Sequence, residues 1–175
     1  MSDVKVVPVI PSAVVERLRR KAKKLVKQDG IAHHAALDIV ARASGRFTDW
    51  HHLIEAAKAT EASEQAFKSG LIIGMDPKDV DFDQSRIRRF VRDERVLVFL
   101  RLEFEKQHPQ PLCEDDRWGW TDIEQLEYFR PKLSLPDSLH AVMQLCREDF
   151  FFAPRYVRLK GKVLQDPFSD EAENG

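Results

Sequence analysis

The chain has 175 residues, of which 43% are hydrophobic and 33% are charged, a composition typical of a soluble, helix-rich protein with a real core. No apolar run approaches the ~20 residues that a membrane-spanning helix needs, and no basic stretch followed by a long apolar segment opens the chain. We therefore expect no secretory signal, no membrane association and a cytoplasmic location. The two cysteines, Cys113 and Cys146, are too few for a disulfide framework.

The net charge of −1 hides a strong asymmetry along the chain. Residues 11–60 contain ten Lys/Arg and five Asp/Glu, whereas residues 61–175 contain 17 Lys/Arg and 23 Asp/Glu. A basic N-terminal part on an acidic remainder can indicate contact with nucleic acid. It can equally let the two parts dock on each other, so the charge pattern alone does not decide between these interpretations.

Residues 1–60 are predicted to form a basic module of three helices. The first helix starts near Ser12 and ends at Asp29-Gly30, and its apolar residues recur at helical spacing with Lys and Arg on the remaining surface. A second helix is expected over residues 31–44, and Gly45 suits the left-handed position after its end. Thr48 or Asp49 can cap a third helix that reaches Lys58.

Residues 61–165 are predicted to form an acidic α+β domain, and residues 166–175 a disordered acidic tail. The whole chain is therefore predicted to be α+β and mainly α. Residues 96–105 fit both a helical stripe and strand alternation, and we favour helix because Ser85 to Lys106 is rich in Arg and Glu and lacks Gly and Pro. From residue 71 to residue 120 we expect a buried strand or connector at 71–75, a loop at 76–83, a helix at 85–106 and a loop at 108–120. Helices follow at 122–129 and from Pro136, and residues 150–152 form a buried anchor. The last element is a strand at 155–163, in which Val157 and Arg158 point to opposite faces.

The basic first helix is the leading candidate for function. Seven Lys/Arg lie between Arg17 and Lys27 and could neutralise phosphates of a nucleic acid. The second and third helices also have the pattern of a helix–turn–helix, although the third carries Asp49 and Glu55 and a single lysine at its end. The alternative is a solvated face beside an ordinary helix corner. The residues predicted to contact nucleic acid or another anion are Arg20, Lys23, Lys24, Lys27, Arg42 and Arg46.

A second hypothesis is a protein-interaction module that uses an acidic, tryptophan-containing loop, as an inhibitor, antitoxin-like protein or assembly factor would. Its predicted contact residues are Trp118, Trp120, Asp115 and Asp116, since exposed tryptophans near charge are typical interaction anchors.

A third hypothesis is a metal-dependent hydrolase built from residues 76–83 and the histidine pairs at 33–34 and 51–52. Adjacent histidines on a helix point about 100° apart, so each pair offers one ligand easily. The aspartates at 79, 81 and 83 imitate a calcium loop, but Gln84 and Phe90 stand where that loop needs Gly and Glu. We therefore predict no catalytic residue, no metal and no cofactor.

Three stretches carry a resemblance to a known family: Leu18 to Leu25, Ala36 to Arg42 with Gly45, and Phe47 to Leu53. Residues 17–58 resemble a small helical domain of bacterial proteins, many on plasmids and other mobile elements, that is often labelled glyoxalase-related. The resemblance implies a three-helix fold and a bacterial accessory setting. It implies no catalytic residue, because the spaced His/Glu metal set and the paired βαβββ units of a glyoxalase are missing.

The preferred interpretation is a non-enzymatic bacterial accessory or regulatory protein. Its basic module would bind nucleic acid or an acidic protein surface. The sequence leaves the oligomeric state open, a homo-oligomer included.

Overall fold

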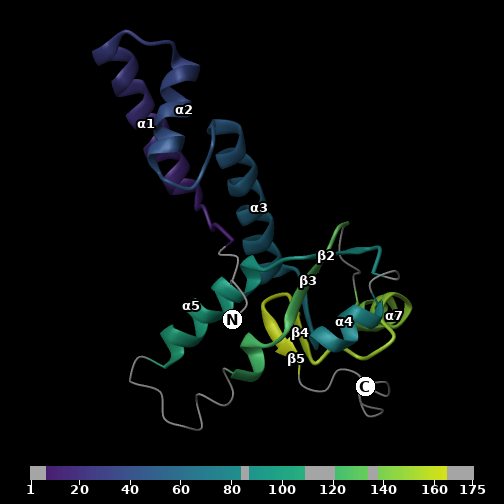
Figure 1. The fold of residues 1–175 in the computed structure, drawn as a ribbon. Helices are drawn as coiled ribbons and strands as arrows, with labels where there is room; N and C mark the ends of the chain where they lie inside the picture. Colours follow the sequence, from purple (N-terminus) through teal and green to yellow (C-terminus); the bar gives the residue numbers. More distant parts are fainter. Residues whose placement is uncertain (1–6, 84–86, 109–120, 134–137, 165–175) are drawn as a thin grey trace. The chain divides into compact units, whose positions relative to one another are not determined.

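A computed structural model describes residues 7–83, 87–108, 121–133 and 138–164, without the side chains of residues 81–83. The chain divides into two compact units, Met1–Ala62 and Ser63–Gly175 (Figure 1). The division falls within helix α3 (Trp50–Ser69), two residues after the predicted boundary at residue 60. The acidic tail predicted at residues 166–175 lies outside the described residues.

The first unit consists of α1 (Ser12–Asp29), α2 (His33–Ala43) and the first part of α3. A connection of three residues joins α1 to α2, and the two helices lie side by side as an antiparallel pair (Figure 1). Gly30 takes the left-handed conformation after α1, with φ of 65°, and its N–H donates to the Val26 carbonyl at 3.1 Å. The small core of this unit contains Val15, Leu18, Ala22, Ala36, Val40, Ala41, Phe47, Leu53 and Ala56.

The second unit is built around an antiparallel sheet with the strand order β2-β3-β1-β4-β5. The predicted fold class, α+β and mainly α with a three-helix N-terminal module, is therefore confirmed. The strands are β1 (Leu71–Met75), β2 (Phe90–Arg92), β3 (Glu127–Pro131), β4 (Tyr156–Leu159) and β5 (Lys162–Leu164), and the helices are α4 (Pro77–Asp83), α5 (Arg95–Gln107) and α7 (Leu139–Asp149), with a short helical turn at 121–124.

The central strand β1 is buried on both faces of this sheet, and every one of its residues is buried. Leu71, Ile73 and Met75 pack into one apolar cluster, which also contains Val142 of α7. Ile72 faces the opposite cluster, which contains residues of α5 and the end of α3. Successive residues of a strand point to opposite faces, so a continuous apolar strand needs cover on both sides.

Helix α4 (Pro77–Asp83) lies where the sequence predicted a loop over residues 76–83. Asp76 caps this helix: its carboxylate accepts from the N–H of Lys78 at 3.0 Å, and its carbonyl accepts from Val80 at 3.1 Å. Pro77 occupies the first helical position, where a missing N–H costs nothing. Asp76 and Pro77 thus begin a helix, and they do not interrupt one.

The prediction of a helix over residues 85–106 is wrong for the first part of this range. Residues 90–92 form β2, which pairs with β3, and only α5 is helical, as favoured for residues 96–105. Asp93 separates the two elements and is buried. Its carboxylate accepts from the Ser63 hydroxyl at 2.6 Å and from Nε of Arg130 at 2.7 Å.

Two further elements differ from the prediction. Residues 127–131 form β3 and not the end of a helix, because Tyr128 and Phe129 are buried in the sheet. The single strand predicted at 155–163 is a hairpin, β4–β5, whose turn has positive φ at both Lys160 (49°) and Gly161 (77°). Of the anchor predicted at 150–152, Phe150 is buried and the two following phenylalanines are exposed.

Arg158 lies on the face of β4 opposite Val157, as the alternation predicted, and it is buried there. Its guanidinium forms a bidentate pair with the Glu103 carboxylate at 2.7 and 3.0 Å. Its Nε donates to the Phe67 carbonyl at 3.0 Å, and its charged group lies 4.0 Å from the centre of the Phe67 ring. Both faces of the sheet are covered, so even the polar positions of β4 are enclosed and need partners.

Glu103→Gln is expected to lower the free energy of unfolding by about 2 kcal/mol, because it leaves the buried Arg158 guanidinium opposite a neutral group. Urea unfolding followed by circular dichroism measures the change. Glu105→Gln is the matched control, since its exposed carboxylate pairs with Arg101 of the same helix at 3.6 Å and is worth about 0.5 kcal/mol or less. Equal losses for the two variants would contradict this account of Arg158.

Candidate nucleic-acid interface

Helix α1 has one buried side and one strongly basic side. Val15, Leu18 and Ala22 are buried in the core of the first unit. All seven Lys/Arg between Arg17 and Lys27 are exposed. A helix that turns by 100° per residue separates the two sets because their positions differ by about half a turn. The packing of the apolar side therefore fixes the direction in which the charges point.

Six of these seven cations make no ion pair or side-chain hydrogen bond with any part of the chain that the structure describes. The exception is Arg19, which pairs with Glu16 at 2.5 Å and lies 6.0 Å from the centre of the Trp50 ring. The six together are called the cationic face. They are Arg17, Arg20, Lys21, Lys23, Lys24 and Lys27.

The middle of the cationic face is a straight stripe along the helix. Its members follow one another at intervals of three, four and three residues, which keeps them on one side of an α-helix over about 15 Å. The predicted contact residues on α1 are therefore brought together, and Arg17 and Lys21 join them. The sequence prediction missed these two, although the same spacing could have found them. The stripe consists of Arg17, Arg20, Lys24 and Lys27.

Arg42 and Arg46, which the sequence grouped with the basic helix, lie elsewhere in the first unit. Both are exposed, and Nε of Arg42 donates to the Asp38 carbonyl at 3.3 Å. Because α1 and α2 are antiparallel, the end of α2 that holds Arg42 lies towards the start of α1, away from Lys27. These two arginines are therefore not part of the stripe.

The N-terminus of α3, which a helix–turn–helix would use for recognition, is occupied by carboxylates. Oδ1 of Asp49 accepts from the N–H of His52 at 2.8 Å, and Oδ1 of Asp38 accepts from the N–H of Trp50 at 2.9 Å. The hydrogen bond from His52, followed by that from the Thr48 hydroxyl, lowers the pKa of Asp49 and keeps it ionised. Two negative charges thus stand where a recognition helix would approach phosphates.

The connection between α2 and α3 is also longer than that of a helix–turn–helix. Residues 44–49 separate the two helices, whereas the DNA-binding motif uses a turn of three or four residues. Gly45 takes φ of 74° in this connection, and Phe47 is buried below it. The corner positions the helices and the capping carboxylates, whereas α1 presents the cationic face.

The other candidate sites are the metal ligands, the cysteines and the tryptophan-containing loop. Among the residues that the structure describes, no group of three His, Cys, Asp or Glu side chains could hold a metal ion. Burial, reinforced by Asp149, raises the pKa of the Cys146 thiol to about 12, which makes it a poor nucleophile. The predicted partner-binding residues Trp118, Trp120, Asp115 and Asp116 lie outside the described residues.

A cavity of about 580 Å³ in the second unit is lined by charged and aromatic side chains, among them Asp76, Asp122, Arg155 and Tyr156. Across the cavity, Arg155 pairs with Asp76 at 3.7 Å. No His, Cys or Ser is among its described lining residues, and the carboxylates of Asp76 and Asp122 have no histidine beside them in that lining. We assign it no reaction.

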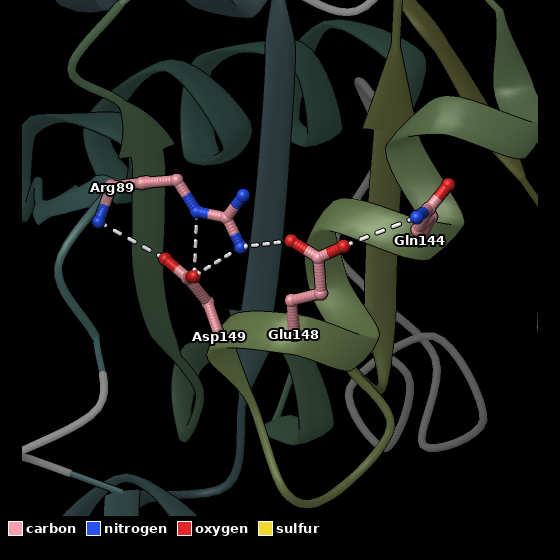
Figure 2. Close-up of polar contacts among 4 residues, drawn as sticks. All are labelled: Arg89, Gln144, Glu148 and Asp149. Atoms are coloured by element: carbon pink, nitrogen blue, oxygen red, sulfur yellow. Dashed lines mark hydrogen bonds and ion pairs between the residues drawn. The ribbon is translucent and has the colours of Figure 1, made fainter.

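A cluster of charged side chains in the second unit has a structural role. Arg89 donates from its backbone N–H and from Nε to the two oxygens of the buried Asp149, at 3.0 and 2.7 Å (Figure 2). Its guanidinium also pairs with Glu148 at 2.8 Å, and Gln144 donates to the same carboxylate at 3.1 Å. The hydrogen bond to Asp149 raises the pKa of Arg89. These charges are satisfied by one another and tie α7 to the strand β2.

No family model matches the chain, and neither a curated protein nor a solved structure is significantly similar to it. The function is therefore inferred from the geometry and charge of the described side chains. No helix in the described ranges is both long and apolar enough to cross a membrane.

Asp38→Ala is expected to lower the free energy of unfolding by about 1 kcal/mol, because the N–H of Trp50 loses its acceptor at the start of α3. Thermal unfolding followed by circular dichroism measures the loss. Asp38→Asn is the matched control, since the amide oxygen can still accept this hydrogen bond. A loss of the same size for both variants would mean that the negative charge, and not the hydrogen bond, stabilises the helix.

Proposed function

We propose that the protein is a non-enzymatic, cytoplasmic accessory protein of bacteria that binds nucleic acid through the cationic face of α1. The observation that supports this proposal is the exposure of six cations that are not ion-paired with the described part of the chain. Cations that serve only to stabilise a fold are usually found beside carboxylates, as Arg89 and Arg158 are here. Those of α1 are directed outwards instead.

Phosphate contacts would supply most of the affinity. Each Lys or Arg that neutralises a phosphate releases condensed counterions, so the logarithm of the binding constant falls with the logarithm of the salt concentration by about 0.9 per contact on duplex DNA. If all six cations take part, the slope is about −5. Affinity would then fall on the order of 10³-fold between 50 and 200 mM salt.

The chemistry of the interface indicates binding without a preferred sequence. Base edges are read by groups held in fixed geometry at a groove, most often by a recognition helix whose N-terminus faces the bases. In this chain Asp38 and Asp49 occupy the N-terminus of α3, and the cationic face offers flexible Lys and Arg side chains. We expect the protein to contact the backbone and to tolerate many sequences.

Replacing Arg20, Lys24 and Lys27 together by Gln is expected to weaken binding to nucleic acid on the order of 10²-fold at 0.1 M salt, because three phosphate contacts are lost. Fluorescence anisotropy over a series of salt concentrations measures both the affinity and a slope that decreases by about 3. Circular dichroism checks that α1 remains helical.

The control triple variant replaces Lys58, Lys68 and Arg101 by Gln and changes the net charge equally. These cations are exposed but are paired with carboxylates of their own helices, so their loss should alter affinity little. Equal weakening by both variants would show that net charge, and not the cationic face, governs binding. No binding to any nucleic acid at low salt would overturn the proposal.

Glu16→Gln is expected to strengthen binding about fivefold, because it removes a negative charge from α1 and releases Arg19 from its ion pair. In the same anisotropy titration, the plot of the logarithm of the binding constant against the logarithm of the salt concentration should be steeper by about 1. Glu55→Gln is the matched control, since it removes a carboxylate that pairs with Lys58 on α3. A gain of affinity in both variants, or in neither, would argue against the role of α1.

A further inference from the structure

We infer that the cationic face fits a double-stranded nucleic acid, whose two phosphate backbones it contacts across a groove, and that single strands bind more weakly. This inference rests on the proposed function and adds the class of ligand. It follows from the width of the cationic face, from the density of its charges and from the residue types on α1.

The cationic face has two flanks as well as a central stripe. Lys21 and Lys23 are two residues apart, which places their side chains about 160° apart around the helix axis. The stripe of Arg20 and Lys24 runs between them. A single strand lying along the stripe would leave at least one flank without a phosphate.

A duplex groove matches this arrangement in size. An α-helix with its side chains is about 10–12 Å across, and the major groove of B-DNA is about 12 Å wide with a phosphate backbone on each side. With α1 over such a groove, Lys21 would reach one backbone and Lys23 the other, and the long side chains of the stripe would extend to phosphates on either side. The flanks thus account for both strands of a duplex.

The density of charge also favours a duplex. The stripe from Arg17 to Lys27 extends about 15 Å. A duplex presents one phosphate per ~1.7 Å of its axis, or about nine over this length, whereas one strand of the same helix presents about four. Six cations can each find a phosphate only on the duplex.

The side chains of α1 lack the groups that bind single strands. Proteins that bind single-stranded nucleic acid combine a basic groove with aromatic rings on which the bases stack. The sequence of α1, Ser12–Asp29, contains no aromatic residue. The nearby ring of Trp50 is half-buried and is approached by Arg19 of the same unit.

The test compares a 20-base-pair DNA duplex with each of its separate strands, bound to the full chain and followed by fluorescence anisotropy at several salt concentrations. We expect the duplex to bind at least about tenfold more tightly at 0.1 M salt, because it engages about two more cations. The slope should be steeper for the duplex, since each contact contributes about 0.9 on a duplex and about 0.7 on a single strand.

Two double variants of equal charge test the flanks. Lys21→Gln with Lys23→Gln should weaken duplex binding more than single-strand binding and so reduce the preference for the duplex. Arg20→Gln with Lys24→Gln should weaken both, because the stripe contacts either ligand. Circular dichroism of both variants checks that the helices are intact.

Equal affinity for the duplex and its strands, or an unchanged preference in the flank variant, would overturn this inference and leave the proposed function standing. No binding of either DNA at 20 mM salt would overturn both. Polyglutamate that competes as well as the duplex would also overturn both, since it would indicate an acidic protein surface as the partner.

Discussion

The burial of one side of α1 is the constraint on which the functional interpretation depends. Val15, Leu18 and Ala22 must leave water for the first unit to have a core, and this packing directs the opposite side of the helix outwards. In proteins most of the stability of a helix comes from the packing of its apolar side, so tertiary packing, and not the propensity of its lysines and arginines, holds α1. The cations are ordered in space because the apolar residues are buried, and mutual repulsion among them is the cost.

In the second unit, by contrast, several arginines are paired with carboxylates. Arg89, Arg130 and Arg158 each meet a carboxylate that is distant in sequence, and these pairs join α7 to β2, the β2–α5 turn to β3, and β4 to α5. Buried or half-buried pairs of this kind are costly to break and specify which elements pack together. The contrast between the two units is the physical basis for assigning binding to α1 and a structural role to the arginines of the sheet.

Local patterns in the sequence were enough to predict the first unit. The helical spacing from Val15 to Lys27 and the glycine after each of the first two helices are contained within short windows. The sheet was harder, because β2 is flanked by Arg and Glu and becomes a strand only through β3, about 40 residues later. The burial of Arg158 depends on Glu103, which lies 55 residues away, and on cover over both faces. The cap that Asp38 provides for α3 likewise joins residues that no local window contains.

The position of β1 at the centre of the sheet has a consequence for synthesis of the chain. Its neighbours β3 and β4 begin at residues 127 and 156, so a ribosome must add more than 50 residues before the strand finds its first partner. At about 5–20 residues per second, an apolar segment stays unpaired for several seconds. The first unit, whose helices pack through close neighbours in sequence, completes its contacts earlier. The basic helical unit can therefore fold while the hydrophobic strand behind it still has no partner.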